Sequence, residues 1–326
     1  MIPLLLLLVS ADPSGAPADA RADTLRAQAR AALGGEAALS IVRALSLQGK
    51  FRRQPPPGSA SAAGGDARPP RGPWGREAEG ELTVEIALPD KLRREESFAV
   101  GSGPSVTMIV GLDGERAWMG TDGAAFPGRF GGRGGPDGSA GPGGTAGMSA
   151  EERKGMEEQR RAAMGRRMRA ELARLLLALL ADPGEGASTT YGGQAESPDG
   201  RADILDVTSA AGAKTRVFLD ATTHLPLMLT YQETMPPRRF RRPPAGGEGA
   251  DGPPPVPAPD APDASPTDAV PRTVESTLFL SDHRAVGGVQ LPHHLSRAVN
   301  GTVLEEWSVT RWRVNPSLKP ERFARQ

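Results

Sequence analysis

The stretch GELTVEIALPDKLRREESF, residues 80–98, decides the fold expected for this chain. Apolar and polar residues alternate through its first half, and this period of two is typical of a strand with one buried face. Pro89-Asp90 then ends or turns the strand, and residues 91–95 continue as an antiparallel partner. The predicted buried face of the first strand carries Leu82, Val84, Ile86 and Leu88.

Further blocks of the same kind follow one another along the chain. Asp113-Gly114 and Asn300-Gly301 are strong hairpin signals within them. Because most blocks are joined by hairpin-length turns, we expect an antiparallel meander rather than βαβ units. The predicted fold class is α+β, with one antiparallel sheet curved around an apolar interior and covered by helices. The strand blocks are residues 45–51, 80–98, 106–119, 202–231, 274–280 and 302–314.

Helical signals occur at two places. Asp23 fits the N-cap of a helix that Gly34-Gly35 ends, and residues 36–40 add another turn. Ser149 and Glu152 form a capping box at the start of a long helix, which we expect to reach Asp182. The second half of that helix has an apolar stripe fit for burial. The stripe consists of Met168, Leu172, Leu175, Leu176 and Leu179.

Three segments differ from the rest in composition. The 326 residues include 41 Gly and 32 Pro, concentrated at residues 54–76, 121–148 and 235–271. Such segments cannot bury enough apolar surface to order themselves, so we expect long disordered loop inserts. About 200 residues remain for folding, enough for one good core. We therefore expect a single domain over residues 12–326.

The first eleven residues, MIPLLLLLVSA, resemble the apolar part of a secretory signal with a small-residue cleavage site. The usual positive segment is missing. The absence of cysteine excludes disulfides, thiolate metal sites and thiol nucleophiles. Lys+Arg and Asp+Glu both number 39, and this neutral balance argues against nucleic-acid binding. We expect export to a bacterial periplasm.

The residue types that carry chemistry form no convincing catalytic pattern. Adjacent His293 and His294 point to opposite faces of a strand, so they are poor partners for one metal ion. The consecutive run at 281–283, Ser-Asp-His, cannot form a hydrolase triad because its side chains diverge. We expect no enzyme activity, no catalytic residue, no metal and no cofactor. The carboxylates Glu81, Glu85, Glu305 and Glu306 are interpreted as solvated groups on the outer face.

Arginine clusters at 52–53, 166–169 and 238–242 have two interpretations. They are candidate contacts with anionic lipid headgroups at a membrane surface. Alternatively, they are solvated charge on loops and on an exposed helix face.

The apolar inner faces of the strands are the positive indication of function. They predict either a concave ligand-binding cavity or an ordinary core that the helices fill. The candidate ligand-binding residues are Leu45, Leu47, Leu82, Val84, Ile86, Val106, Met108, Leu278, Leu280, Trp307 and Val309.

The order of several short motifs resembles the outer-membrane lipoprotein-sorting (Lol-type) carrier family. The motifs are GGEAAL at 34–39, the strand block 45–51, GELTVEIALPDKLRRE at 80–95, VGLDGERAWM at 110–119, FLD at 218–220, SDHRAVGGVQLP at 281–292 and RVNPSL with a later Phe at 313–323. The resemblance implies an incomplete antiparallel β-barrel with helices as a lid, which holds the acyl chains of a lipid or lipoprotein. The three inserts and the long charged helix depart from true carriers.

We therefore expect a periplasmic, non-enzymatic carrier whose partners are lipid or lipoprotein acyl chains. Two alternatives remain open. One is an envelope interaction module that docks protein partners through its sheet edges and its Arg/Pro-rich inserts, and the other is an exported hydrolase.

Overall fold

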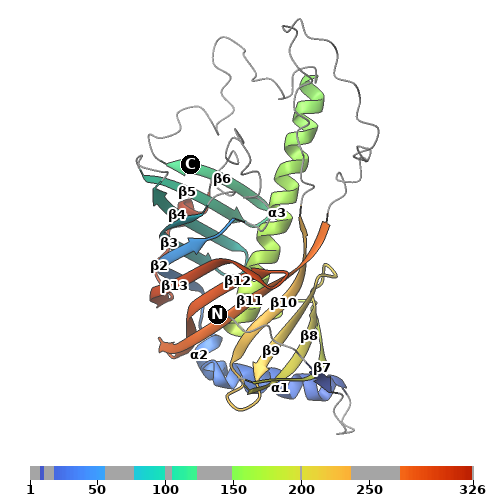
Figure 1. Cartoon of the computed structure of the whole chain (residues 1–326). Coiled ribbons are helices and arrows are strands. Elements are labelled where there is room, and N and C mark those ends of the chain that lie inside the picture. The colour runs from blue at the N-terminus through green and yellow to red at the C-terminus, as the bar shows by residue number, and fades with distance from the viewer. Residues whose placement is uncertain are drawn as a thin grey trace, which may run out of the picture.

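The computed structural model describes residues 8–10, 18–55, 77–99, 105–122, 149–198, 200–235 and 272–324 (Figure 1). The predicted inserts fall almost entirely outside these ranges. The strands before the second and third inserts run slightly further than expected, to Asp122 and Met235. The predicted signal also lies outside, except for the strand Leu8–Ser10.

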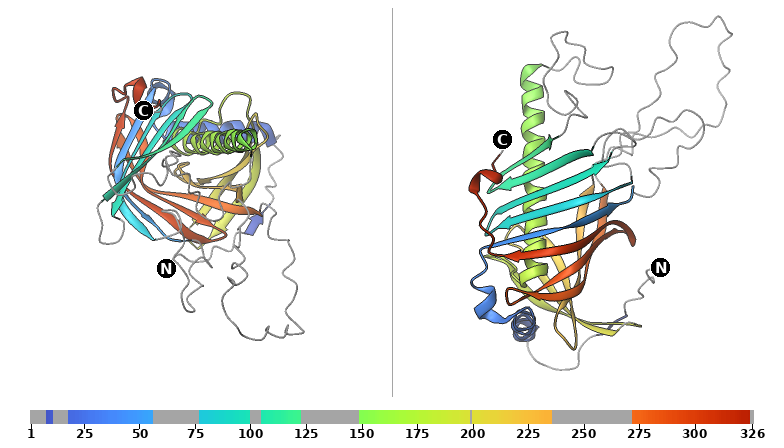
Figure 2. Two further views of the ribbon diagram at one scale, coloured as in Figure 1. Left: turned by 90° about the horizontal axis from the view of Figure 1, so that it is seen from above. Right: turned by 90° about the vertical axis from the view of Figure 1, so that its left-hand side faces the viewer.

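Thirteen strands of the described residues form one antiparallel sheet, in the order β1-β7-β8-β9-β10-β11-β12-β13-β2-β3-β4-β5-β6. The sheet has two free edges, β1 and β6, and it curves around an interior (Figure 2). This confirms the predicted fold class of a curved, unclosed antiparallel sheet with helices. The strands are β1 (Leu8–Ser10), β2 (Ala44–Arg53), β3 (Ala78–Ala87), β4 (Lys91–Ala99), β5 (Ser105–Asp113), β6 (Arg116–Asp122), β7 (Ser188–Ser197), β8 (Gly200–Thr208), β9 (Lys214–Asp220), β10 (Pro226–Met235), β11 (Arg272–Val286), β12 (Val289–Val299) and β13 (Thr302–Val314).

The stretch at 80–98 forms most of β3 and β4, which turn at Pro89 as expected. Both predicted hairpins form, since β5 pairs with β6 and β12 with β13. At the second turn, Asn300 and Gly301 both adopt the positive φ values that a type I′ turn needs, 46° and 78°. Strand β7 was not predicted. Its sequence STTYGGQAES has no clean alternation, and its pairing with β8 shifts register between Tyr191 and Gly193.

Within the described ranges, three α-helices accompany the sheet: α1 (Ala18–Ala32), α2 (Gly35–Leu39) and α3 (Ala150–Leu180). Helix α1 packs against β7 and β8. Helix α3 lies across the open side of the curved sheet and contacts both β6 and β10 (Figure 2). The predicted apolar stripe of α3 lies at this interface, with Leu172, Leu175 and Leu179 all buried. None of the helices in the described ranges has the length and apolarity that crossing a membrane requires.

The predicted capping box of α3 is confirmed. The Ser149 hydroxyl accepts a hydrogen bond from the Glu152 amide at 3.1 Å, and the Glu152 carboxylate accepts one from the Ser149 amide at 2.7 Å. The helix ends at Ala181, which adopts a left-handed conformation.

Replacing Ser149 should loosen the start of α3. We expect Ser149→Ala to destabilise the first turn by about 1 kcal/mol, because one amide of the helix start loses its acceptor. Amide hydrogen exchange of residues 151–153 would measure the change as faster exchange. Ser308→Ala, at an exposed serine of β13, is the control. Equal exchange rates in both variants would contradict a stabilising role for the cap.

Candidate functional site

A cavity of about 440 Å³ lies between α3 and the concave face of the sheet. Its volume falls within the range of about 300–1,000 Å³ that is typical of small-molecule sites. Met119 and Arg167 are exposed, so they mark the entrance, whereas Leu175, Leu295 and Leu304 are buried and mark the interior. The apolar wall includes Met164, Met168, Leu175, Leu278, Leu295 and Trp307.

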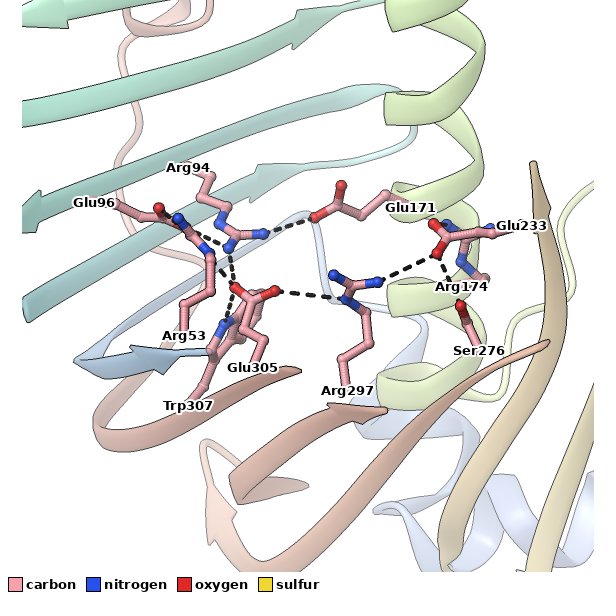
Figure 3. Close-up of polar contacts among 10 residues, drawn as sticks. All are labelled: Arg53, Arg94, Glu96, Glu171, Arg174, Glu233, Ser276, Arg297, Glu305 and Trp307. Atoms are coloured by element: carbon pink, nitrogen blue, oxygen red, sulfur yellow. Dashed lines mark hydrogen bonds and ion pairs between the residues drawn. The ribbon is translucent and has the colours of Figure 1, made fainter. Parts of the chain in front are cut away.

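Charged side chains also reach the cavity, because they occupy inward-facing positions of the strands. Glu305 lies two residues before Trp307 on β13, so both side chains point to the same face of the sheet. The register places Glu305 opposite Arg53 of β2 and also opposite Arg297 of β12. Arg94 reaches the same region from β4 (Figure 3).

Glu305 is the centre of this buried charged network. Its carboxylate pairs closely with Arg94, lies 3.6 Å from Arg297 and 3.9 Å from Arg53, and accepts a hydrogen bond from the Trp307 indole at 2.9 Å. Only 6% of Glu305 is exposed. The groups that contact its carboxylate are three guanidinium cations and one hydrogen-bond donor, so the arrangement favours the ionised carboxylate.

The pKa of Glu305 shows which effect dominates. Burial alone would raise it, but attraction by Arg94, Arg53 and Arg297, with the hydrogen bond from Trp307, lowers the pKa of Glu305 to about 2. The reverse holds for Arg94. Burial would lower its pKa, and the carboxylates of Glu305, Glu96 and Glu171 raise it above the ordinary value instead. Both groups therefore stay charged at neutral pH.

The network also joins α3 to the sheet on both sides of the cavity (Figure 3). Arg94 of β4 pairs with Glu171 of α3 at 3.3 Å. Arg174 of α3 lies 3.7 Å from Glu233 of β10, which also pairs with Arg297 at 3.3 Å. These ion pairs fix the helix over the open side of the sheet.

The structure places the eleven predicted ligand-binding residues in three groups. Two of them, Leu278 and Trp307, line the cavity. Val106 of β5 is buried but is not part of the main core cluster. The others are packed within that core: Leu45, Leu47, Leu82, Val84, Ile86, Met108, Leu280 and Val309. Contact of these residues with a ligand stays a prediction.

The interpretation of two carboxylates as solvated outer-face groups is wrong. Glu305 points inward and is buried, because it shares the period-two face of Trp307. Glu85 does lie on the outer face, but it is 7% exposed, because Arg322 of the C-terminal segment covers it and donates a hydrogen bond at 2.8 Å. Glu81 is exposed and Glu306 is half-buried.

The cavity-lining arginines were not among the predicted ligand-binding residues, although Arg53 and Arg167 belong to two of the arginine clusters noted in the sequence. Arg53, Arg94 and Arg297 all lie on strands, at positions in phase with buried apolar neighbours such as Phe51 and Leu92. This spacing of two residues from a core position can be seen in the sequence, and it indicates that the arginine side chains point inward. An arginine on the face of a strand that also carries core residues must either be paired or reach a cavity.

The Ser-Asp-His run at 281–283 lies on β11. Asp282 is turned toward Arg284, whose guanidinium donates hydrogen bonds to it at 2.6 and 2.9 Å. His293 lies near the Leu291 carbonyl, with 3.1 Å between its Nδ1 and that oxygen. Over the described ranges no group of three or more His, Asp or Glu side chains is arranged to hold a metal ion.

Comparisons with known proteins find similarity only among solved structures. No protein-family model and no curated protein matches the chain. A DUF1329 family protein from Desulfovibrio piger is 10% identical, with 94% of this chain and 98% of that chain covered and a TM-score of 0.40. A LolA superfamily protein from Nitrosomonas europaea is 9% identical, with 93% and 97% covered and a TM-score of 0.37. Similarity at this level concerns the fold alone, so membership of the carrier family stays a prediction.

Proposed function

We propose that this protein is a non-enzymatic periplasmic carrier that holds the acyl chain of a lipid or lipoprotein between α3 and the sheet. The observation that carries the proposal is the cavity of about 440 Å³ that the protein's own core leaves open. Its apolar wall suits an alkyl chain. The residues at its rim, Met119 and Arg167, are exposed, so an alkyl chain can enter the cavity from solvent.

The energetics favour a long alkyl chain over a compact polar ligand. Each methylene that leaves water for an apolar site contributes about 0.8 kcal/mol. Affinity should therefore rise about fourfold with each added methylene until the cavity is full. Such a site would therefore discriminate between ligands by the length of their alkyl chain.

The charged groups support binding rather than catalysis. A general acid or base at neutral pH needs a pKa near the working pH. The pKa of Glu305 is about 2, and its carboxylate is held by three arginines and an indole. The network therefore acts as a fixed wall of the cavity and as the attachment of α3.

Filling the cavity should weaken binding without unfolding the protein. We expect Leu278→Trp to weaken binding of decanol and dodecanol at least tenfold, because the larger side chain occupies the space of the alkyl chain. Displacement of the neutral fluorescent dye N-phenyl-1-naphthylamine would measure this. Leu227→Trp is the matched control, because Leu227 is 38% exposed and does not line the cavity.

Two results would contradict the proposal. One is an affinity that does not change from octanol to dodecanol in the unmodified protein. The other is equal binding by Leu278→Trp and Leu227→Trp, which would place the alkyl chain outside this cavity.

A further inference from the structure

The charges around the cavity do not cancel. Five arginines line it, Arg53, Arg94, Arg167, Arg174 and Arg297, but only three glutamates do. Glu96 lies beside the cavity and pairs with both Arg53 and Arg94. The three lining glutamates and Glu96 together supply four negative charges against five arginines. One positive charge of the lining therefore has no counterpart.

Arg167 is that remaining cation. It is exposed at the rim of the cavity, and it makes no ion pair with any residue that the structure describes. Glu171, one turn further along α3, does not neutralise it, because Glu171 pairs with Arg94 across the cavity at 3.3 Å. Arg167 therefore presents a guanidinium whose charge is not paired with any carboxylate of the described ranges.

Arg174 lies deeper on the same face of α3, since residues seven apart are two turns apart. Its side chain is 14% exposed, and its guanidinium lies 4.0 Å from the centroid of the Tyr231 ring. Its nearest carboxylate, Glu233, is 3.7 Å away, beyond hydrogen-bond distance. Glu233 is already engaged by Ser276 at 2.9 Å and by Arg297 at 3.3 Å. The stacking and the ion pair with Glu233 thus orient Arg174, and its guanidinium, which donates no hydrogen bond to a residue that the structure describes, can still donate to a ligand.

From these contacts we propose that the ligand is an anionic amphiphile whose carboxylate or phosphate headgroup binds Arg167 and Arg174. The proposal rests on the proposed function, because the alkyl chain of this ligand occupies the apolar interior. Guanidinium groups bind carboxylate and phosphate through paired, charge-assisted hydrogen bonds. The headgroup lies at the rim of the cavity, and the chain runs from there toward Leu295 and Leu304.

Matched ligands of one chain length test the headgroup separately from the chain. We expect dodecanoate and dodecyl phosphate to displace N-phenyl-1-naphthylamine at concentrations about tenfold lower than dodecanol does. Dodecyltrimethylammonium should bind more weakly than dodecanol. Inorganic phosphate alone should neither displace the dye nor compete with dodecyl phosphate at equal concentration, because it lacks the chain.

Variants of the two arginines identify the site. Arg167→Gln should lower the affinity for dodecanoate much more than the affinity for dodecanol, and so remove most of the preference for dodecanoate. Arg174→Met should do the same if the protein folds, and Arg167→Gln alone decides the matter if it does not. Arg166→Gln is the control, because Arg166 is exposed and does not line the cavity.

The outcomes separate this inference from the proposed function. If dodecanol binds but dodecanoate gains nothing over it, or if the gain survives in Arg167→Gln, the headgroup site is wrong and the carrier function stands. If neither the dye nor any alkyl ligand binds, the carrier function itself is wrong. If inorganic phosphate competes as well as dodecyl phosphate, the arginines bind a free anion and the amphiphile is overturned.

Discussion

Glu305→Gln should destabilise the protein by about 3–5 kcal/mol, the usual cost of removing one partner from a buried ion pair. The glutamine keeps the shape of the side chain but not its charge. The buried region would then keep the positive charges of Arg94, Arg53 and Arg297 but would lose one of the carboxylates that balance them. Urea unfolding followed by circular dichroism would measure the loss as a lower midpoint.

The neighbouring residue supplies the control. Glu306 lies one position along β13 and points to the other face of the sheet, where it is half-buried. We expect Glu306→Gln to change stability by no more than about 0.5 kcal/mol. Removing Arg94 as well, in Glu305→Gln/Arg94→Gln, should cost less than the sum of the two single changes. A loss for Glu305→Gln as small as that for Glu306→Gln would show that the network does not stabilise the fold.

Much of the sheet was predictable, because the period-two pattern of apolar residues follows directly from the geometry of a strand. Residues 80–98 show this most clearly, since the predicted inward face of Leu82, Val84 and Ile86 is buried in the core. The capping box at Ser149 was predictable for a similar reason, because it depends only on residues three positions apart.

The pairing of charges was not predictable in the same way. Arg53 and Glu305 are far apart in sequence and become neighbours only through the pairing of β2 with β13. The sequence shows that Glu305 lies two residues from Trp307 and so shares its face of the strand. A single carboxylate on a strand is, however, more often solvated. Whether the carboxylate is solvated or paired depends on its cross-strand neighbours. These neighbours can be identified only when the order of the strands in the sheet is known.

The cavity depends on the position of α3 relative to the sheet. The apolar stripe of this helix showed that it would be buried, but not how closely it would approach β12 or β13. Ion pairs from Glu171 and Arg174 set that approach, since they connect the helix to β4 and β10. Most of the predicted inner-face residues lie in the core, and the cavity forms where arginines and methionines line the gap.

The same carboxylate makes stability depend on pH in acid. The pKa of Glu305 is about 2 in the folded protein, below its ordinary value of 4.5. A group whose pKa is lowered by folding stabilises the fold above its unfolded pKa and loses that contribution as the pH falls through its folded pKa. We expect the contribution of Glu305 to be complete above about pH 5 and to disappear between about pH 5 and pH 2.

The size of this acid effect follows from the shift and should be visible as a difference between two proteins. A shift of this size corresponds to about 3 kcal/mol in total, of which about 2 kcal/mol is lost by pH 3. Urea unfolding at pH 7, 5, 4 and 3 should therefore show stability falling more steeply in the unmodified protein than in Glu305→Gln, because the glutamine has no proton to bind. Other carboxylates titrate in both proteins and cancel in the comparison. Parallel pH profiles would mean that Glu305 has an ordinary pKa in the folded state, and that the three arginines around it do not hold its charge.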